Sequence, residues 1–288
     1  MAEQKVGIVA ECVCDLPKSY LAEHNIDIVY FLIETDSGVF TDTDEITAEN
    51  ILEYMQSGGM KSKSSAPAPE VYRKVFEDNL GKYDELILVA ISSGISFSCA
   101  NAEKAVLEMG EAGKRVHVFN SKHLSTGLGH IVMKAAELAE GGMSAGEIIT
   151  ELEELRGRVS TSFITENVDF LYRNGRVSEK VKKICSAFNI HPVLTMKNGN
   201  LTLKSVCIGR YEKACSRYIR RELKNADKID KKRAFITSAG CSVKMLERVK
   251  KEVNKQCRFE NLTLTKASAT ISSNCGPNTF GVLYIRNK

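Results

Sequence analysis

The sequence lacks an apolar run long enough to cross a membrane. Its 288 residues contain no window of the ~18 to 20 apolar residues that a bilayer span requires. The first residues, MAEQKVGIVAECVCDLP, also lack the succession of basic, apolar and small-residue regions that marks a cleavable signal. We therefore expect a cytoplasmic protein with no stable membrane insertion.

Basic tails and low-complexity segments are missing as well. The 40 Lys and Arg and 36 Asp and Glu residues give a net charge of +4, and the basic residues look scattered, so we expect no binding to nucleic acid. With 43% hydrophobic and 26% charged residues, the composition is that of a globular protein. The length allows two compact domains.

Several catalytic and metal-binding patterns are absent. The glycine motifs of phosphate-binding and dinucleotide-binding loops do not occur, nor does the G-x-S-x-G motif of hydrolases. None of the five histidines stands at metal-ligand spacing from Cys or Glu, so we expect no metal and no cofactor. The nine cysteines are spread thinly, Cys12 and Cys14 included, which indicates reduced and mostly buried thiols rather than disulfides.

Short apolar runs alternate with helical patterns in the first half of the chain. This alternation predicts parallel strands joined by helices. The expected strands are 6–10, 28–33, 86–91 and 116–119, and the expected helices start near residues 16, 47, 69, 98 and 145. A further long helix is expected to follow a glycine-containing turn after the strand 116–119 and to end at Gly141. We place this parallel-sheet domain at residues 1–157.

The second half predicts a further α/β domain at residues 158–288. Residues 167–184 are typical of two helices around an Asn-Gly turn, and 191–210 of a hairpin that turns at Asn198 and Gly199. Helices are expected at 214–224 and 243–254, and strands at 234–238, 262–264 and the C-terminal GVLYIRN. The predicted fold is thus a two-lobed α/β protein with a ligand crevice between the domains.

Hydroxyls are concentrated in the segment ISSGIS, directly after the strand 86–91. A loop between a parallel strand and a helix exposes backbone N–H groups, and Ser92, Ser93, Ser96 and Ser98 add hydroxyl donors. This pattern favours an anion-binding loop. The alternative is a plain helix cap at Ser96.

Two other segments could contribute to the same crevice. Ser64 and Ser65 lie in KSSAPAP, a polar loop ahead of two prolines. Near the C-terminus, Gly276, Pro277 and Gly281 predict a tight turn before the last strand, with Asn274 and Cys275 beside it. Loops at the carboxyl ends of strands in doubly wound sheets meet at one crevice. Ordinary loop and turn roles are the alternatives.

An enzyme of another class is also compatible with these residues. A serine hydrolase or acyl-transfer enzyme needs a base within hydrogen-bond reach of its nucleophile. His123 is the one candidate base for Ser96. We rank this interpretation below a binding role.

The order of these segments resembles the DegV family of bacterial fatty-acid-binding proteins, over nearly the whole chain. The matching stretches are VGIVAECVCDLP, SSAP, the residues 92–98, the residues 120–129, Asn174 to Arg176, and NCGP. The resemblance implies a non-catalytic protein that holds a fatty acid and presents it to a fatty acid kinase.

The resemblance also implies the binding residues. In the family, hydroxyls from two loops hold the lipid carboxylate, and at the matching positions stand Ser64 and Ser96; Asn274 occupies the position of a histidine near the head group. With Ser93, these form the expected ligand-binding set. A hydrophobic tunnel would take the acyl chain, whose methylenes contribute ~0.8 kcal/mol each.

The sequence departs from the family pattern at two important positions. Asn274 cannot carry charge or transfer a proton as histidine does. Phe97 stands where glycine is usual, and its bulk could shorten, redirect or plug the tunnel. A divergent member that binds another small carboxylate, or contacts a partner through basic residues such as Arg176 and Arg210, is a further alternative.

Overall fold

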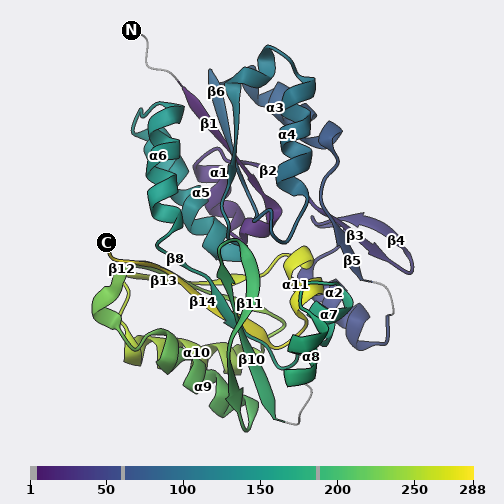
Figure 1. Ribbon diagram of the computed structural model, residues 1–288, viewed down its shortest axis with the longest axis vertical. Helices are drawn as coiled ribbons and strands as arrows, with labels where there is room; N and C mark the ends of the chain where they lie inside the picture. The colour runs from purple at the N-terminus through teal and green to yellow at the C-terminus, as the bar shows by residue number, and fades with distance from the viewer. Residues whose placement is uncertain (1–4, 60–61, 186–188) are drawn as a thin grey trace.

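A computed structural model describes residues 5–59, 62–185 and 189–288. The chain forms two lobes, one built on a parallel sheet and the other on a larger mixed sheet (Figure 1). Helices pack on both, which confirms the predicted α/β class.

The sheet of the first lobe has the strand order β2-β1-β6-β7, and all its neighbours are parallel. The strands are β1 (Val6–Glu11), β2 (Asp27–Val29), β6 (Glu85–Ala90) and β7 (Val116–Asn120). The helices of this lobe are α1 (Lys18–Glu23), α3 (Pro69–Leu80), α4 (Ser98–Glu108), α5 (Ser125–Glu140) and α6 (Ala145–Arg156). Parallel neighbours require a crossover connection such as a helix, because a tight turn reverses the chain and would make the next strand antiparallel.

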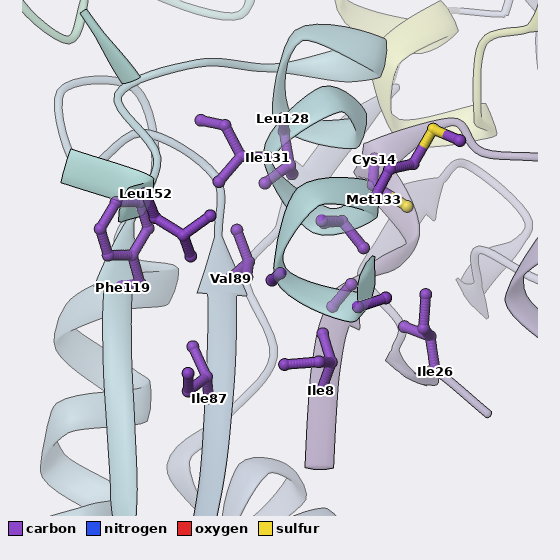
Figure 2. Packing of buried hydrophobic residues seen from close by; sticks show 14 of the residues in the cluster. Ile8, Cys14, Ile26, Ile87, Val89, Phe119, Leu128, Ile131, Met133 and Leu152 are labelled. Carbon is purple, nitrogen blue, oxygen red and sulfur yellow. The ribbon is translucent and has the colours of Figure 1, made fainter. Parts of the chain in front are cut away.

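Both faces of this sheet are buried. Ile8, Ile87 and Val89 belong to a core that includes residues of α5 and α6, and Figure 2 shows their side chains beside Leu128 and Ile131 of α5. The alternate residues of β6, Leu86 and Leu88, form a second core with α3 and α4. Burial on both faces explains why β6 is a continuous apolar run in the sequence.

The second lobe contains a seven-stranded sheet with the order β11-β10-β9-β14-β12-β13, and β8 pairs with β14. Its strands are β8 (Val159–Ser160), β9 (Ser162–Ile164), β10 (Ile190–Lys197), β11 (Asn200–Ile208), β12 (Ile229–Ala239), β13 (Asn261–Lys266) and β14 (Thr279–Arg286). Helices α9 (Tyr211–Glu222) and α10 (Val243–Gln256) share a core with this sheet. In the described part of this sheet, β12–β13 is the one parallel pair, and α10 is the crossover helix that connects these two strands.

The predicted hairpin is confirmed. β10 and β11 pair antiparallel up to Lys197 and Asn200, and the two turn residues between them both have positive φ, as a two-residue hairpin turn requires. The helix, Asn-Gly turn and helix pattern is confirmed as α7 (Asp169–Arg173) and α8 (Glu179–Cys185), with Gly175 at φ +68°.

The prediction of one strand over residues 28–33 was wrong. The run divides into β2, which joins the parallel sheet, and β3 (Leu32–Thr35), which starts a separate small sheet with β4 (Gly38–Thr41) and β5 (Lys63–Ser65). The two halves bond to different partners, which periodicity along one apolar run cannot indicate.

The small sheet packs toward the second lobe. Ile33 of β3 and Ile51 of helix α2 (Ala48–Gln56) form a core with Ala269 of helix α11 (Ala269–Cys275). Short 3-10 helices complete the chain at η1 (Cys12–Cys14), η2 (Ala112–Arg115) and η3 (Ala226–Lys228). Among the described residues all nine cysteines are free, and no helix is both long and apolar enough to cross a bilayer.

Candidate ligand-binding cavity between the two lobes

A cavity of about 750 Å³ lies where the two lobes and the small sheet meet. Its walls come from the loop before α4, from β5, from α7, from α11 and from the inner face of the large sheet. Phe163, Leu171 and Leu283 supply apolar surface. The charged residues that line it, among those the structure describes, are Lys63 and Arg176, both basic.

Ser64 enters this cavity from β5. The strand pairs with β3 in the register Ile33 to Ser64, so the expectation of an irregular loop at this serine was wrong. The side-chain amide of Asn274 donates a hydrogen bond of 2.9 Å to the Ser64 hydroxyl oxygen. Because the Ser64 oxygen is the acceptor of this hydrogen bond, the hydroxyl hydrogen of Ser64 remains available for a ligand.

The three serines of the ISSGIS loop and Ser98, the first residue of α4, have different positions. Ser92 is buried and donates to the carbonyl of Gly199 at 2.5 Å, so it joins the loop to the tip of the β10–β11 hairpin. Ser98 is also fully buried. Ser93 lies at the exposed rim of the cavity, and its hydroxyl accepts a 2.6 Å hydrogen bond from Asn120.

Ser96 lies in the cavity wall, and its hydroxyl oxygen accepts a 3.2 Å hydrogen bond from the backbone N–H of Ser98. The N-cap residue of α4 is Phe97 rather than Ser96. Ser96, the residue before the N-cap, thus accepts a hydrogen bond from the first residue of α4 and supports the start of the helix. Its hydroxyl hydrogen is free to point elsewhere, so the two interpretations of this serine are compatible.

A buried carboxyl group supports the loop from behind. Glu11, at the end of β1, accepts hydrogen bonds from the backbone N–H of Ile91 at 2.7 Å and from the Tyr72 hydroxyl at 2.6 Å. Burial raises the pKa of Glu11 from 4.5 to about 7, although both hydrogen bonds oppose the rise. Glu11 therefore fixes the point where the chain leaves β6 and enters the cavity wall.

The opposite wall is helix α11, which was not predicted from the sequence. The expected turn before the last strand is present at residues 277–278, but Gly281 lies in β14, and Asn274 belongs to the helix that precedes the turn. Helix α11 continues to Cys275 and ends at Gly276, whose φ is +76°. The hydroxyl of Ser268 caps the first turn by accepting from the N–H of Ile271 at 3.3 Å. A serine before an apolar residue is a helix-start signal that the sequence contained.

Two carboxyl groups of the first lobe hold the start of α11. Asp42 accepts from the backbone N–H groups of Ala269 at 3.0 Å and Thr270 at 2.8 Å. Asp15 accepts from the N–H of Ser268 at 2.8 Å and from the Ser125 hydroxyl at 2.5 Å. Burial raises the pKa of Asp15 from 3.8 to about 7. The hydrogen bonds to Ser268, Ala269 and Thr270 link positions more than 200 residues apart in the chain.

Polar atoms of α11 are left without a partner beside the cavity. Among the described residues, the side-chain oxygens of Thr270 and Asn274 are buried and make no hydrogen bond. Both residues line the cavity. Since buried polar atoms are normally satisfied, these two oxygens indicate that a polar group of a ligand or water belongs nearby.

His123 is not placed as a base for Ser96. Its imidazole is buried, with Nδ1 2.9 Å from the Thr161 hydroxyl and Nε2 3.0 Å from the carbonyl of Arg156. Burial lowers the pKa of His123 from 6.5 to about 4. Both ring nitrogens are therefore engaged by groups other than Ser96, which removes the base that the hydrolase hypothesis needed.

Two residues differ from their expected positions. Phe97 is 81% exposed at the cavity mouth, so its ring does not plug the cavity. Arg176 is half-buried and lines the cavity rather than standing on an open docking face. Its partial burial lowers the pKa of the guanidinium from its usual value.

Among the described residues, no group of three or more metal-ligating side chains is present.

Comparison with known proteins matches this architecture to one family. The family model described as "Uncharacterised protein, DegV family" covers residues 5–287, which include both lobes and every wall of the cavity. The chain belongs to the DegV family. The resemblance read from the sequence motifs is thereby confirmed.

Relatives of this DegV protein agree with it over their full length. A DegV domain-containing protein of Caldanaerobacter subterraneus is 26% identical over 284 residues, covering 98% of this chain and 99% of the relative. A DegV family protein of Thermus thermophilus, for which fatty acid binding is described, is 26% identical with a TM-score of 0.89 and covers 98% and 100% of the two chains.

A fatty acid kinase B3 protein of Streptococcus pneumoniae, loaded with linoleic acid, has the same fold. It is 21% identical to this DegV protein, with a TM-score of 0.83, and the match covers 98% of this chain and 100% of the other.

Proposed function

We propose that this DegV protein binds a long-chain fatty acid in the cavity between its lobes. The observation that carries the proposal is the composition of that cavity. Hydroxyls of Ser64 and Ser96 stand among apolar side chains, and the described residues that line it include two cations and no carboxylate. A long-chain fatty acid has the same division into one anionic group and a long apolar chain.

The carboxylate would lie between β5 and the loop before α4. Ser64 and Ser96 each have the hydroxyl oxygen engaged as an acceptor and a hydrogen left to donate. Asn274 orients Ser64, and Ser93 adds a hydroxyl at the rim. Arg176 supplies a positive charge in partly desolvated surroundings, where its attraction for an anion is stronger than in water.

The acyl chain would occupy the apolar part of the cavity. Each buried methylene contributes ~0.8 kcal/mol, so the chain rather than the head group would supply most of the affinity. This arrangement requires no catalytic residue and no cofactor. By analogy with its family, the protein would present the bound acid to a fatty acid kinase.

The test is to purify the protein gently, extract it with organic solvent and identify any bound lipid by mass spectrometry. We expect a long-chain fatty acid, and a labelled fatty acid should bind again to the delipidated protein. Ser64→Ala with Ser96→Ala should weaken that binding by about tenfold, since two charge-assisted hydrogen bonds are lost. Ser57→Ala, an exposed serine at the end of α2, is the control that should leave binding unchanged.

Other results would contradict the proposal in distinct ways. A different small carboxylate in the extract, with no fatty acid binding, would favour the divergent-member hypothesis. Labelling of Ser96 by a serine-reactive probe, lost in Ser96→Ala, would favour an enzyme.

A further inference from the structure

Charge is strongly divided between the two halves of this chain. Residues 1–157 contain 13 Lys and Arg but 26 Asp and Glu, whereas residues 158–288 contain 27 Lys and Arg but only 10 Asp and Glu. The small net charge of +4 therefore conceals an acidic half of −13 and a basic half of +17. The expectation that the basic residues are scattered was wrong when the two halves of the chain are compared.

A groove between α9 and α10 concentrates this positive charge. It measures about 780 Å³ and lies on the opposite side of the large sheet core from the fatty acid cavity, with which it shares no lining residue. Both walls are rich in basic residues, and each wall contains one carboxylate. The basic residues of the groove are Lys213, Arg217, Arg220, Lys244, Arg248, Lys251 and Lys255.

The two carboxylates show how the walls hold an acidic side chain. Glu212 of α9 pairs with Arg248 of α10 at 2.6 Å, and Glu252 of α10 pairs with Arg220 of α9 at 3.3 Å. Each carboxylate is thus bound by the opposite helix.

Four lysines of the groove remain available. Lys213, Lys244, Lys251 and Lys255 are exposed, and none forms an ion pair with another of the described residues. Their uncompensated charges repel one another in the isolated protein, so an anionic partner would relieve that repulsion.

We propose that the α9–α10 groove binds an acidic segment of a partner protein, with its carboxylates pairing to these lysines. The groove is concave and bounded by two helices, which suits a single helix or extended segment. Met245 lines the groove and is half-buried, so it provides apolar contact for such a segment, while Ile219 and Val249 lie buried beneath the groove in the core.

Other anionic partners fit the groove less well. Of the residues that the structure describes, no aromatic one lines the groove, so these residues offer no stacking surface of the kind that single-stranded nucleic acids use. A bilayer is flat and would touch the helix ridges rather than the groove between them. A long polyanion would also extend beside the acidic half of the molecule, whereas a short segment contacts the groove alone.

The experiment uses the full chain and a fluorescein-labelled helical peptide that alternates glutamates with a leucine face. Fluorescence anisotropy should show saturable binding that weakens with added salt. Lys213→Glu with Lys251→Glu should reduce the affinity at least about tenfold, because two attractive pairs become repulsive. Lys224→Glu with Lys228→Glu is the matched control. It makes the same change in net charge in the same half, outside the groove, and should alter the affinity less than about twofold.

Four results would overturn the proposal. These are no saturable peptide binding, equal losses in the groove and control variants, tighter binding of duplex DNA or phosphatidylglycerol vesicles than of the peptide, and self-association of the protein that the groove variant abolishes. Thermal unfolding of both double variants verifies that each is folded, and Lys213→Gln with Lys251→Gln repeats the test without reversing charge.

Discussion

The two walls of the cavity in this DegV protein differ in what holds them in place. The loop before α4 is fixed mainly within its own lobe, by the end of β6, by Glu11 and by the start of α4. Helix α11 is fixed by Asp15 and Asp42, which come from the other end of the chain. The loop wall is therefore a local feature of the parallel sheet, whereas the α11 wall exists only after the lobes have assembled.

This difference predicts the largest effect for Asp42→Ala. Two buried N–H groups at the start of α11 would lose their acceptor, so we expect about 3 kcal/mol of lost stability. Fatty acid binding should fall as well, because α11 carries Asn274. Urea unfolding measures the loss. Asp44→Ala, which removes only an exposed pair with Lys18, is the control and should cost less than about 0.5 kcal/mol. Equal losses would remove the distinction between the walls.

Gly94→Ala tests a contact through which the loop wall depends on the second lobe. A β-carbon at Gly94 would lie 2.3 Å from the carbonyl oxygen of Gly199, so the hairpin tip must move. We expect a loss of about 2 kcal/mol and faster dissociation of a labelled fatty acid. Gly146→Ala is the matched control, since nothing lies within 4 Å of its added carbon and helix α6 should become slightly more stable. An unchanged dissociation rate would show that the tip does not close the cavity.

Tyr72→Phe tests the support of the loop by Glu11. The pKa of Glu11 is about 7 in the fold and 4.5 as a free side chain, so its contribution to stability is complete below pH 4.5 and declines as the pH rises through 7. Above pH 7 the carboxylate of Glu11 is ionised, and the hydrogen bonds from Tyr72 and Ile91 then stabilise its buried charge. Loss of the Tyr72 hydroxyl should therefore cost about 2 kcal/mol at pH 8 but only about 1 kcal/mol at pH 5. Unfolding at the two pH values measures this, and a constant cost would contradict the role of the charge.

The smallest effect is expected for Phe97→Ala. Because the ring is 81% exposed, its removal should change stability by less than about 0.5 kcal/mol. The length of the fatty acids recovered from the protein should also stay the same, since the ring does not fill the cavity. A shift to longer acyl chains in the extract would restore the hypothesis that Phe97 limits the tunnel.

Much of the fold could be predicted because its signals are local. The buried run of β6 and the Asn-Gly turn of the β10–β11 hairpin depend on residues a few positions apart. The prediction at residues 28–33 failed because the two halves of one apolar run join different sheets. Helix α11 was missed although Ser268 signals its start, because glycine and proline directly after it favoured a turn.

The sequence by itself determined the two-lobed α/β class and the serine-rich loop after β6, and through the resemblance it led to the proposal that Ser64 and Ser96 bind the carboxylate. Only the tertiary structure decided which hydroxyls reach the cavity, that His123 is engaged elsewhere, and that Asp15 and Asp42 hold α11. The physical reason is the separation along the chain of the residues that interact. Turns and strand patterns arise from neighbouring residues, whereas the burial of a carboxyl group and the orientation of Asn274 toward Ser64 depend on segments that meet only in the folded chain.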